Sequence, residues 1–348
     1  MRAPLPFTGI ALAALLAGAC ATTSTTPTAP PPTTADGDVD KTPRVTGKEV
    51  FESEDWIVAI ARPGDTSERL AKRFLGDSAL AWRIEDYNDR ATFTAGEAVV
   101  IPKRSWNTSG VEPSGYQLVP VLVYHDIAPQ AKGRMVIAAK TFEEQMQYLK
   151  AQGYRVVSMR DFYDFISLNR QLPRKAVLLT FDDGYKSFMT YAYPVLKQLG
   201  FTATLFVYTD YVGAGRNALT WDDLNRLARE GFDVEGHSKT HSDLRRRQGE
   251  SEAEQVRRLR SEMDVPQKLF QQRFGQPARF LAYPYGAQDD TVLQNVREFG
   301  YVAGFTVFRE GNSAFVHPFR VRRSQIYSEM SLEDFAKNLN TFSHETLK

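Results

Sequence analysis

Carboxylate and imidazole side chains follow two apolar segments in the second half of the sequence. Asp182 and Asp183 come directly after "AVLLTF", and His237 and His241, four residues apart, come after "FDVEG". In a helical turn that spacing directs both imidazoles to one side. Two histidines and one carboxylate leave coordination positions open, which is typical of a catalytic divalent metal such as Zn²⁺. The second aspartate then stays free to act as a base.

Each of these residues taken alone also fits a structural role. A histidine after a strand is often a structural residue, and paired aspartates are common helix caps. The combination of residue types and spacing favours the metal site.

The elements that must position these side chains alternate along the chain. From about residue 118 onward, apolar β-branched runs alternate with stretches of helical periodicity, several of which end at a glycine. This pattern predicts a mostly parallel sheet covered by helices, as a (β/α) barrel or an open doubly wound sheet. In both architectures the carboxyl ends of the strands meet on one face. Tyr285, after "FLAYP", and the segment Tyr124 to Asp126, after "VPVLV", would join the aspartates and histidines there.

The length and net charge of the chain limit its domain organisation and its classes of partner. The chain has 348 residues, enough for a large and a small domain plus a tail. Its 43 basic and 42 acidic residues give a formal net charge of +1, so nothing in the overall charge favours a nucleic-acid partner.

The N-terminus has the layout of a secretory signal. Residues 1–20 contain a basic start, a short apolar run and the only cysteine, Cys20. The ending "LAGAC" resembles the lipobox of bacterial lipoproteins, which implies a lipid anchor at Cys20; a signal peptide with an incidental cysteine is the alternative. Ala21 follows, and in Gram-negative lipoproteins this implies sorting to the outer membrane, facing the periplasm. The Thr- and Pro-rich residues 21–53 predict a flexible tether.

Residues 54–104 predict a compact α+β unit with the order strand, helix, helix, strand. Its segments "RPGDT", "EDYN" and "AGEAVVIP" resemble those of LysM domains. The resemblance implies binding to glycans that contain N-acetylglucosamine, usually peptidoglycan. A small docking domain without a ligand is the alternative.

The segments "TFDDG", "HSKTH" and "YPYG", in this order, resemble the first three motifs of the polysaccharide deacetylases, the NodB-homology or carbohydrate esterase family four enzymes. "VLVYHDI" resembles the opening of the branch that acts on exopolysaccharides, the poly-N-acetylglucosamine deacetylases. The resemblance implies a distorted (β/α) barrel over residues 117–340. It also implies a hydrolase that removes N-acetyl groups with Zn²⁺ or a related ion such as Co²⁺ or Ni²⁺.

The resemblance also assigns roles. Asp182 would be the general base, Asp183, His237 and His241 the metal ligands, and the backbone N–H of Tyr285 the donor to the developing oxyanion. A metal ion would polarise the acetyl carbonyl, and the base would take a proton from water, which agrees with the chemistry of amide hydrolysis.

Two family features are missing. The position of the arginine that orients the base is occupied by Ala282, and "HPFRVRRSQIY" does not end in the histidine that usually serves as general acid. His317 is a candidate substitute, with a structural role in its loop as the alternative.

The sequence therefore predicts a lipid-anchored envelope deacetylase that acts on an N-acetylglucosamine polymer, with an exopolysaccharide favoured. Peptidoglycan is the alternative substrate. The alternative outside the enzymes is a non-catalytic, peptidoglycan-binding lipoprotein.

Overall fold

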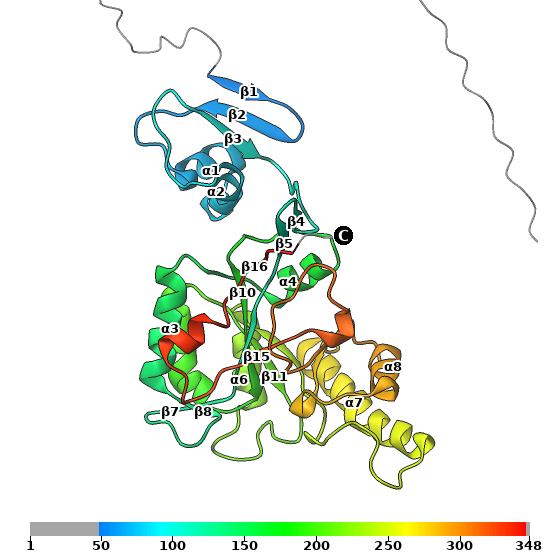
Figure 1. Ribbon diagram of the computed structural model, residues 1–348. Coiled ribbons are helices and arrows are strands. Elements are labelled where there is room, and N and C mark those ends of the chain that lie inside the picture. The colour runs from blue at the N-terminus through cyan, green and yellow to red at the C-terminus, as the bar shows by residue number, and fades with distance from the viewer. Residues whose placement is uncertain (1–48, 346–348) are drawn as a thin grey trace, which may run out of the picture. The chain divides into compact units, whose positions relative to one another are not determined.

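The computed structural model describes residues 49–345 (Figure 1). The predictions for the signal peptide 1–20, the anchor at Cys20 and most of the tether 21–53 fall outside this range. Within it, no helix combines the length and the apolar character that crossing a membrane requires.

The first part of this range is a small α+β unit. Its three strands form an antiparallel sheet in the order β1-β2-β3, and its helices α1 and α2 lie between β2 and β3 in sequence. The bounds are β1 (Val50–Glu52), β2 (Trp56–Ile60), α1 (Ser67–Leu75), the 3-10 helix η1 (Ser78–Leu80), α2 (Ala81–Asn88) and β3 (Ala98–Pro102). The order strand, helix, helix, strand is as expected, with β1 in addition. The LysM identity stays a prediction.

The larger part of the range is built on a parallel sheet. Its main path runs β14-β13-β12-β11-β10-β6-β15, with β9 paired to β10 as the eighth strand. The bounds are β6 (Val121–Tyr124), β9 (Arg155–Val156), β10 (Ala176–Asp183), β11 (Thr204–Val207), β12 (Asp233–Gly236), β13 (Phe280–Ala282), β14 (Ala303–Phe305) and β15 (Ser324–Gln325). In register, Asp182 lies opposite Phe206 of β11, and Phe181 lies opposite Tyr124 of β6.

Backbone hydrogen bonds bring together the two ends of this strand order, β14 and the segment before β15. The N–H of Thr306 donates to the carbonyl of Val321 at 2.8 Å, and the N–H of Val321 donates to the carbonyl of Gly304 at 2.9 Å. The segment that leads into β15 therefore runs beside β14, while β15 itself pairs with β6. The sheet is thus curled as expected for a distorted (β/α) barrel and is not an open doubly wound sheet.

Helices cover the outside of the curled sheet, with α3 on one side and α7 and α8 on the other (Figure 1). Their bounds are α3 (Ala139–Ala151), α4 (Met159–Ile166), α5 (Tyr193–Leu199), α6 (Trp221–Arg229), α7 (Glu252–Phe274), α8 (Asp290–Glu298) and α9 (Leu332–Ala336). The short elements are β4 (Val111–Glu112), β5 (Gly115–Gln117), β7 (Asp126–Ala128), β8 (Val136–Ala138), β16 (Phe342–Ser343), the π-helix η2 (Phe188–Ala192), and the 3-10 helices η3 (Pro284–Gly286) and η4 (Pro318–Arg320).

Side chains of β10 alternate between two apolar cores. Val177, Leu179 and Phe181 pack with the helices outside the sheet. Ala176 and Leu178 join a second cluster with residues of β6, β11, β13 and β14, which fills the inside of the barrel. Because strand side chains alternate with a period of two, Thr180 and Asp182 face the barrel interior.

Candidate active site

Asp183, His237 and His241 come together at the carboxyl end of the sheet. Each offers one ligand atom, and these atoms lie within 4.8 Å of one another. The Oδ1 of Asp183 is 3.3 Å from Nε2 of His241 and 3.6 Å from Nε2 of His237. This oxygen is buried and has no hydrogen-bond partner among the described residues. A buried carboxylate oxygen facing two imidazole nitrogens fits a divalent cation.

His237 is held in the tautomer that a metal ligand needs. Its Nδ1 lies 2.7 Å from the carbonyl oxygen of Ala282. Because a carbonyl only accepts, Nδ1 carries the proton and Nε2 presents its lone pair to the cluster. Burial also lowers the pKa of His237 to about 4, which keeps the ring neutral near pH 7. Ala282, at the position of the missing family arginine, thus orients His237 through its backbone.

Adjacent aspartates on a strand normally point to opposite faces, yet both reach this site. Asp183 has φ 75°, which ends the strand alternation at the second carboxylate. Ser238, His241 and Tyr285 also have left-handed φ values, of 67°, 60° and 60°. Non-glycine residues rarely adopt this conformation, and such strain gathers at functional sites.

The segment from His237 to His241 is not the helical turn that the spacing suggested. It is an irregular bend after β12, and left-handed backbone at Ser238 and His241 brings the two rings to 4.8 Å between centroids. The prediction of a helical turn was wrong, whereas the convergence of the two imidazoles is observed.

Glu262 of α7 stabilises this bend through hydrogen bonds. This buried carboxylate accepts hydrogen bonds from the N–H groups of Lys239 and Thr240, at 3.1 and 2.9 Å, and from the hydroxyl of Thr240 at 2.7 Å. Glu262 could not be predicted from the sequence, because a charged residue inside an amphipathic helix carries no signal of its contacts.

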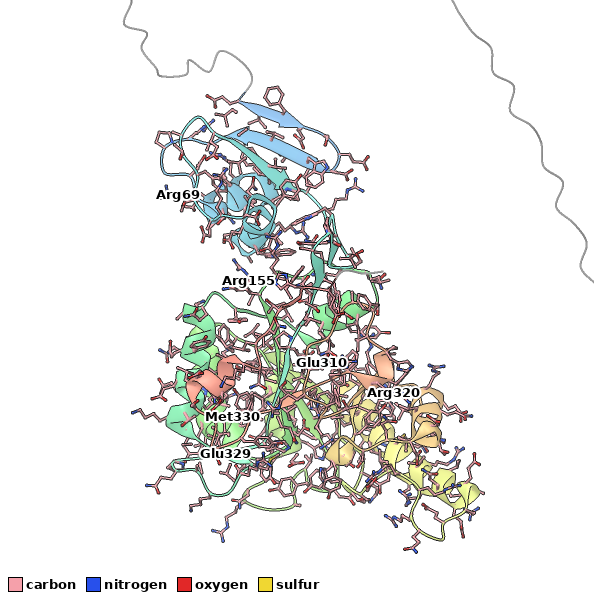
Figure 2. All side chains as sticks on the ribbon, viewed as in Figure 1. Arg69, Arg155, Glu310, Arg320, Glu329 and Met330 are labelled. Atoms are coloured by element: carbon pink, nitrogen blue, oxygen red, sulfur yellow. The ribbon has the colours of Figure 1, made fainter. Side chains whose placement is uncertain are left out.

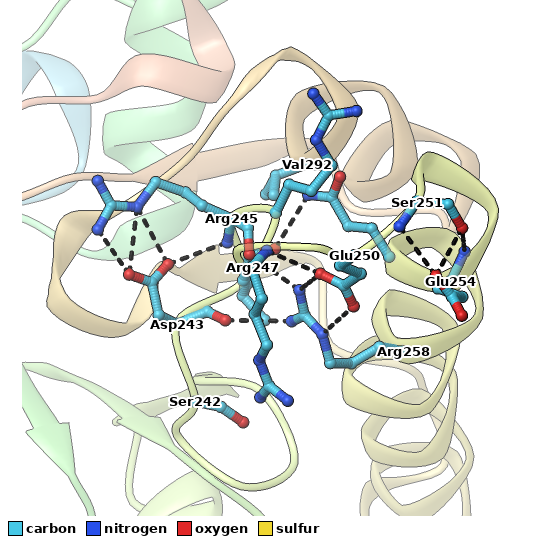
Figure 3. Close-up of polar contacts among 12 residues, drawn as sticks. Ser242, Asp243, Arg245, Arg247, Glu250, Ser251, Glu254, Arg258 and Val292 are labelled. Carbon is cyan, nitrogen blue, oxygen red and sulfur yellow. Dashed lines mark hydrogen bonds and ion pairs between the residues drawn. The ribbon is translucent and has the colours of Figure 1, made fainter.

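The chain beyond His241 is fixed by the first turns of the same helix (Figure 3). Arg258 donates to the carbonyls of Asp243 and Arg245 at 3.1 and 2.9 Å and pairs with Glu250 at 2.7 Å. Ser251 and Glu254 form a capping box at the start of α7. Helix α7 therefore anchors the loop that carries both histidines.

Asp182 lies next to the cluster and is paired with Arg323 inside the barrel. Two guanidinium nitrogens reach the two carboxylate oxygens at 2.7 and 2.8 Å, and both side chains are buried. Arg323 also donates from Nε to the carbonyl of Thr306 at 2.9 Å. Burial alone would raise the pKa of Asp182, but the charge of Arg323, with a smaller contribution from His237, brings it to about 2. Asp182 is therefore ionised at neutral pH.

Arg323 is a second residue that no sequence motif marks. It lies just before β15, within "HPFRVRRSQIY", the segment that lacks the family histidine. Only the closure of the barrel brings it to Asp182, which thereby gains an arginine partner although Ala282 stands at the position of the family arginine.

Tyr285 lies at the rim of the cluster. The residue is 64% exposed, and its ring packs against His241 at 4.7 Å between centroids. Among residues 49–345, its backbone N–H donates to no other backbone group. That N–H is available to a ligand.

Two further histidines, His125 and His317, differ in environment. His125 follows β6; its Nδ1 is buried without a hydrogen-bond partner among the described residues. Burial lowers its pKa, and the charges of Asp182 and Asp183 oppose this shift. His317, in contrast, is exposed, and its Nδ1 accepts the N–H of Phe319 at 3.2 Å as the cap of η4. The structure gives His317 a structural role and His125 the position near the aspartates.

Sequence comparisons agree with this geometry. The family model described as polysaccharide deacetylase matches residues 169–304. "Putative polysaccharide deacetylase YxkH" of Bacillus subtilis is 30% identical over 211 residues, which cover 60% of this chain and 72% of that protein. "Poly-beta-1,6-N-acetyl-D-glucosamine N-deacetylase" of Staphylococcus epidermidis is 23% identical over 215 residues, covering 60% and 74% of the two chains.

Solved structures show the same likeness. The Streptococcus pyogenes deacetylase PplD, in complex with acetate, superposes with a TM-score of 0.58 at 27% identity, covering 65% of this chain and 99% of that one. IcaB from Ammonifex degensii gives a TM-score of 0.57 at 25% identity with the same coverage. The chain belongs to the polysaccharide deacetylase family. The prediction of a hydrolase of this family is confirmed.

Proposed function

We propose that the protein removes N-acetyl groups from an N-acetylglucosamine polymer with the help of a divalent ion. The observation that carries the proposal is the Asp183, His237 and His241 cluster beside the ion-paired carboxylate of Asp182. Zn²⁺ suits two imidazoles and one carboxylate, and Co²⁺ or Ni²⁺ are the alternatives.

Each group of the site has its own role in the proposed reaction. A divalent ion held by the cluster would act as a Lewis acid toward the acetyl carbonyl. Asp182 takes a proton from the attacking water, and Arg323 keeps that carboxylate ionised and fixed in direction. The N–H of Tyr285 donates to the oxygen that gains charge as water adds to the acetyl carbon.

Cleavage of the C–N bond needs a proton on the departing amine. We assign this donor role to His125, whose unpartnered buried nitrogen and closeness to the two aspartates support it. A lowered pKa makes the protonated imidazole a stronger acid. The products are acetate and a glucosamine unit with a free amine.

An exopolysaccharide is the substrate that we favour. The opening "VLVYHDI" supports this choice, as does the name of the Staphylococcus epidermidis relative, which specifies poly-β-1,6-N-acetylglucosamine. Peptidoglycan is the alternative substrate.

The proposal includes a location and an anchor. We propose that a lipid on Cys20 holds the protein at the outer membrane facing the periplasm, and that residues 54–104 bind peptidoglycan as a LysM domain. In the competing hypothesis, the whole chain is a non-catalytic peptidoglycan-binding lipoprotein.

One assay tests the proposal. Purified protein is given Zn²⁺ or Co²⁺ and acetylated glucosamine oligomers, and released acetate is measured. We expect release by the wild type and loss in Asp182→Asn; no release, or equal release by both, would contradict the enzymatic proposal. Parallel reactions with β-1,6-linked oligomers and peptidoglycan fragments separate the two substrates.

A further inference from the structure

A row of aromatic rings leads away from the metal cluster. His241 lies between the rings of Tyr285, at 4.7 Å, and Tyr208, at 5.3 Å. Tyr208 stacks on Tyr211 at 5.2 Å with an interplanar angle of 18°, and Tyr211 meets Tyr185 at 5.7 Å. The row therefore continues through three tyrosines beyond a metal ligand.

Backbone contacts fix the places from which these rings project. Just after Tyr208, the N–H of Thr209 donates to the carbonyl of Ser238 at 3.2 Å, which ties this segment to the histidine bend. Beside Tyr185, the N–H of Leu219 donates to the carbonyl of Gly184 at 2.9 Å. The rings thus belong to the same framework as the cluster.

The three tyrosines have no evident role in the apolar cores. Tyr185, Tyr208 and Tyr211 are half-buried, and among the described residues none of them packs against the barrel's two apolar clusters. The ring contacts from Tyr185 through Tyr211 to Tyr208 join all three to His241 of the metal cluster.

We propose that Tyr185, Tyr208 and Tyr211 form a stacking surface for the sugar units next to the one that loses its acetyl group. The apolar face of a pyranose ring matches the face of an aromatic ring, so the rings supply the stacking contact. This inference rests on the proposed function and deepens it. The enzyme then prefers an oligomer or polymer of N-acetylglucosamine over the single sugar.

A second aromatic surface supplies a control. A cavity of about 750 Å³ on the barrel is lined by Phe308 and Phe315, with Glu310 and Arg320 (both labelled in Figure 2) among its polar residues. Phe315 is 54% exposed and packs on Tyr116 at 5.0 Å. Phe315→Ala removes an exposed aromatic ring that the stacking row does not include.

The test compares chain lengths. The value of kcat/KM is measured on the β-1,6-linked N-acetylglucosamine pentamer and on N-acetylglucosamine itself, and their ratio is followed. In Tyr211→Ala we expect the ratio to fall by roughly threefold to tenfold, as for loss of one aromatic stacking contact. Tyr211→Phe, which keeps the ring, and Phe315→Ala should hold the wild-type ratio.

Two outcomes overturn the inference: an unchanged ratio in Tyr211→Ala, or a change in Phe315→Ala instead. Absence of acetate release by the wild type contradicts the proposed function itself, so the two failures are distinguishable. Calorimetric binding of the pentamer to Asp182→Asn protein, with and without Tyr211→Ala, adds a readout without turnover. We expect Tyr211→Ala to raise Kd by the same factor by which it lowers the ratio. Equal Kd values with and without Tyr211→Ala overturn the inference. Thermal melts confirm that each variant is folded.

Discussion

Arg323 binds both carboxylate oxygens of Asp182, although 141 positions separate the two residues. The contact lies inside the barrel, next to the apolar cluster that fills it, where an unpaired charge would be costly. It holds the Asp182 carboxylate in one orientation and keeps it ionised. For the base role that we propose for Asp182 this comes at the expense of basicity, because a carboxylate with a pKa of about 2 is a weak base. Acidification of the attacking water by a bound metal ion would offset that weakness.

The first prediction concerns this pair. Arg323→Met leaves the buried Asp182 without its partner, and we expect the free energy of unfolding at pH 7.5 to fall by about 3–5 kcal/mol. In the wild type the pKa of Asp182 is lowered, so its contribution to stability is present above the unfolded-state pKa and is lost as the pH falls toward 2. In the variant, burial raises this pKa, so stability falls as the pH rises. The difference between the two proteins should therefore shrink toward pH 5 in denaturant titrations.

The double variant Asp182→Asn with Arg323→Met is the control, because it removes both charges. It should be more stable than Arg323→Met alone at pH 7.5. A stability difference between Arg323→Met and wild type that does not change with pH would show that the charge of Asp182 is not its cause.

The second prediction separates the two histidine candidates for the general acid. His125→Asn removes the buried imidazole, and we expect kcat to fall by roughly 10²- to 10⁴-fold with little change in oligomer binding. His317→Asn is the matched control, since an asparagine oxygen can still accept the N–H of Phe319 and cap η4. The assignment of His125 is wrong if His317→Asn lowers kcat and His125→Asn does not.

The sequence predicted the parts of the site that lie in contiguous motifs. Asp182 and Asp183 end β10, and His237, His241 and Tyr285 follow β12 and β13, so the parallel sheet brings them together at one end. Arg323 and Glu262 could not be found in this way. Their partners depend on how the barrel closes and how α7 packs, and neither follows from local spacing.

The third prediction addresses Glu262, which supports the histidine bend. Glu262→Ala leaves the N–H groups of Lys239 and Thr240 without their acceptor. We expect Zn²⁺ affinity to fall by roughly 10- to 100-fold, as for loss of a residue that orients metal ligands. Competition with a chelating dye measures this affinity. Glu254→Ala, which removes an exposed cap on the same helix, should change stability slightly and Zn²⁺ affinity not at all; equal losses of affinity in both variants would contradict the positioning role.

The fourth prediction concerns the pH dependence of metal binding. Burial, with the charge of Asp182 in addition, raises the pKa of Asp183 to about 6, whereas His237 stays neutral down to about pH 4. Between these values the metal must displace a proton from Asp183, so Zn²⁺ affinity should fall by about tenfold per pH unit below pH 6.

Calorimetry in buffers of different ionisation enthalpy measures that proton. We expect about one proton released per ion at pH 5 and much less at pH 7.5. Because a ligand that binds only the folded state stabilises it, a Zn²⁺ concentration of 100 times Kd should add about 2.7 kcal/mol to the free energy of unfolding at pH 7.5, and less at pH 5. Asp183→Asn should bind weakly and release no proton from this position. Equal proton release by the variant and the wild type at pH 5 would assign the titrating group elsewhere, with His241 as the next residue to test.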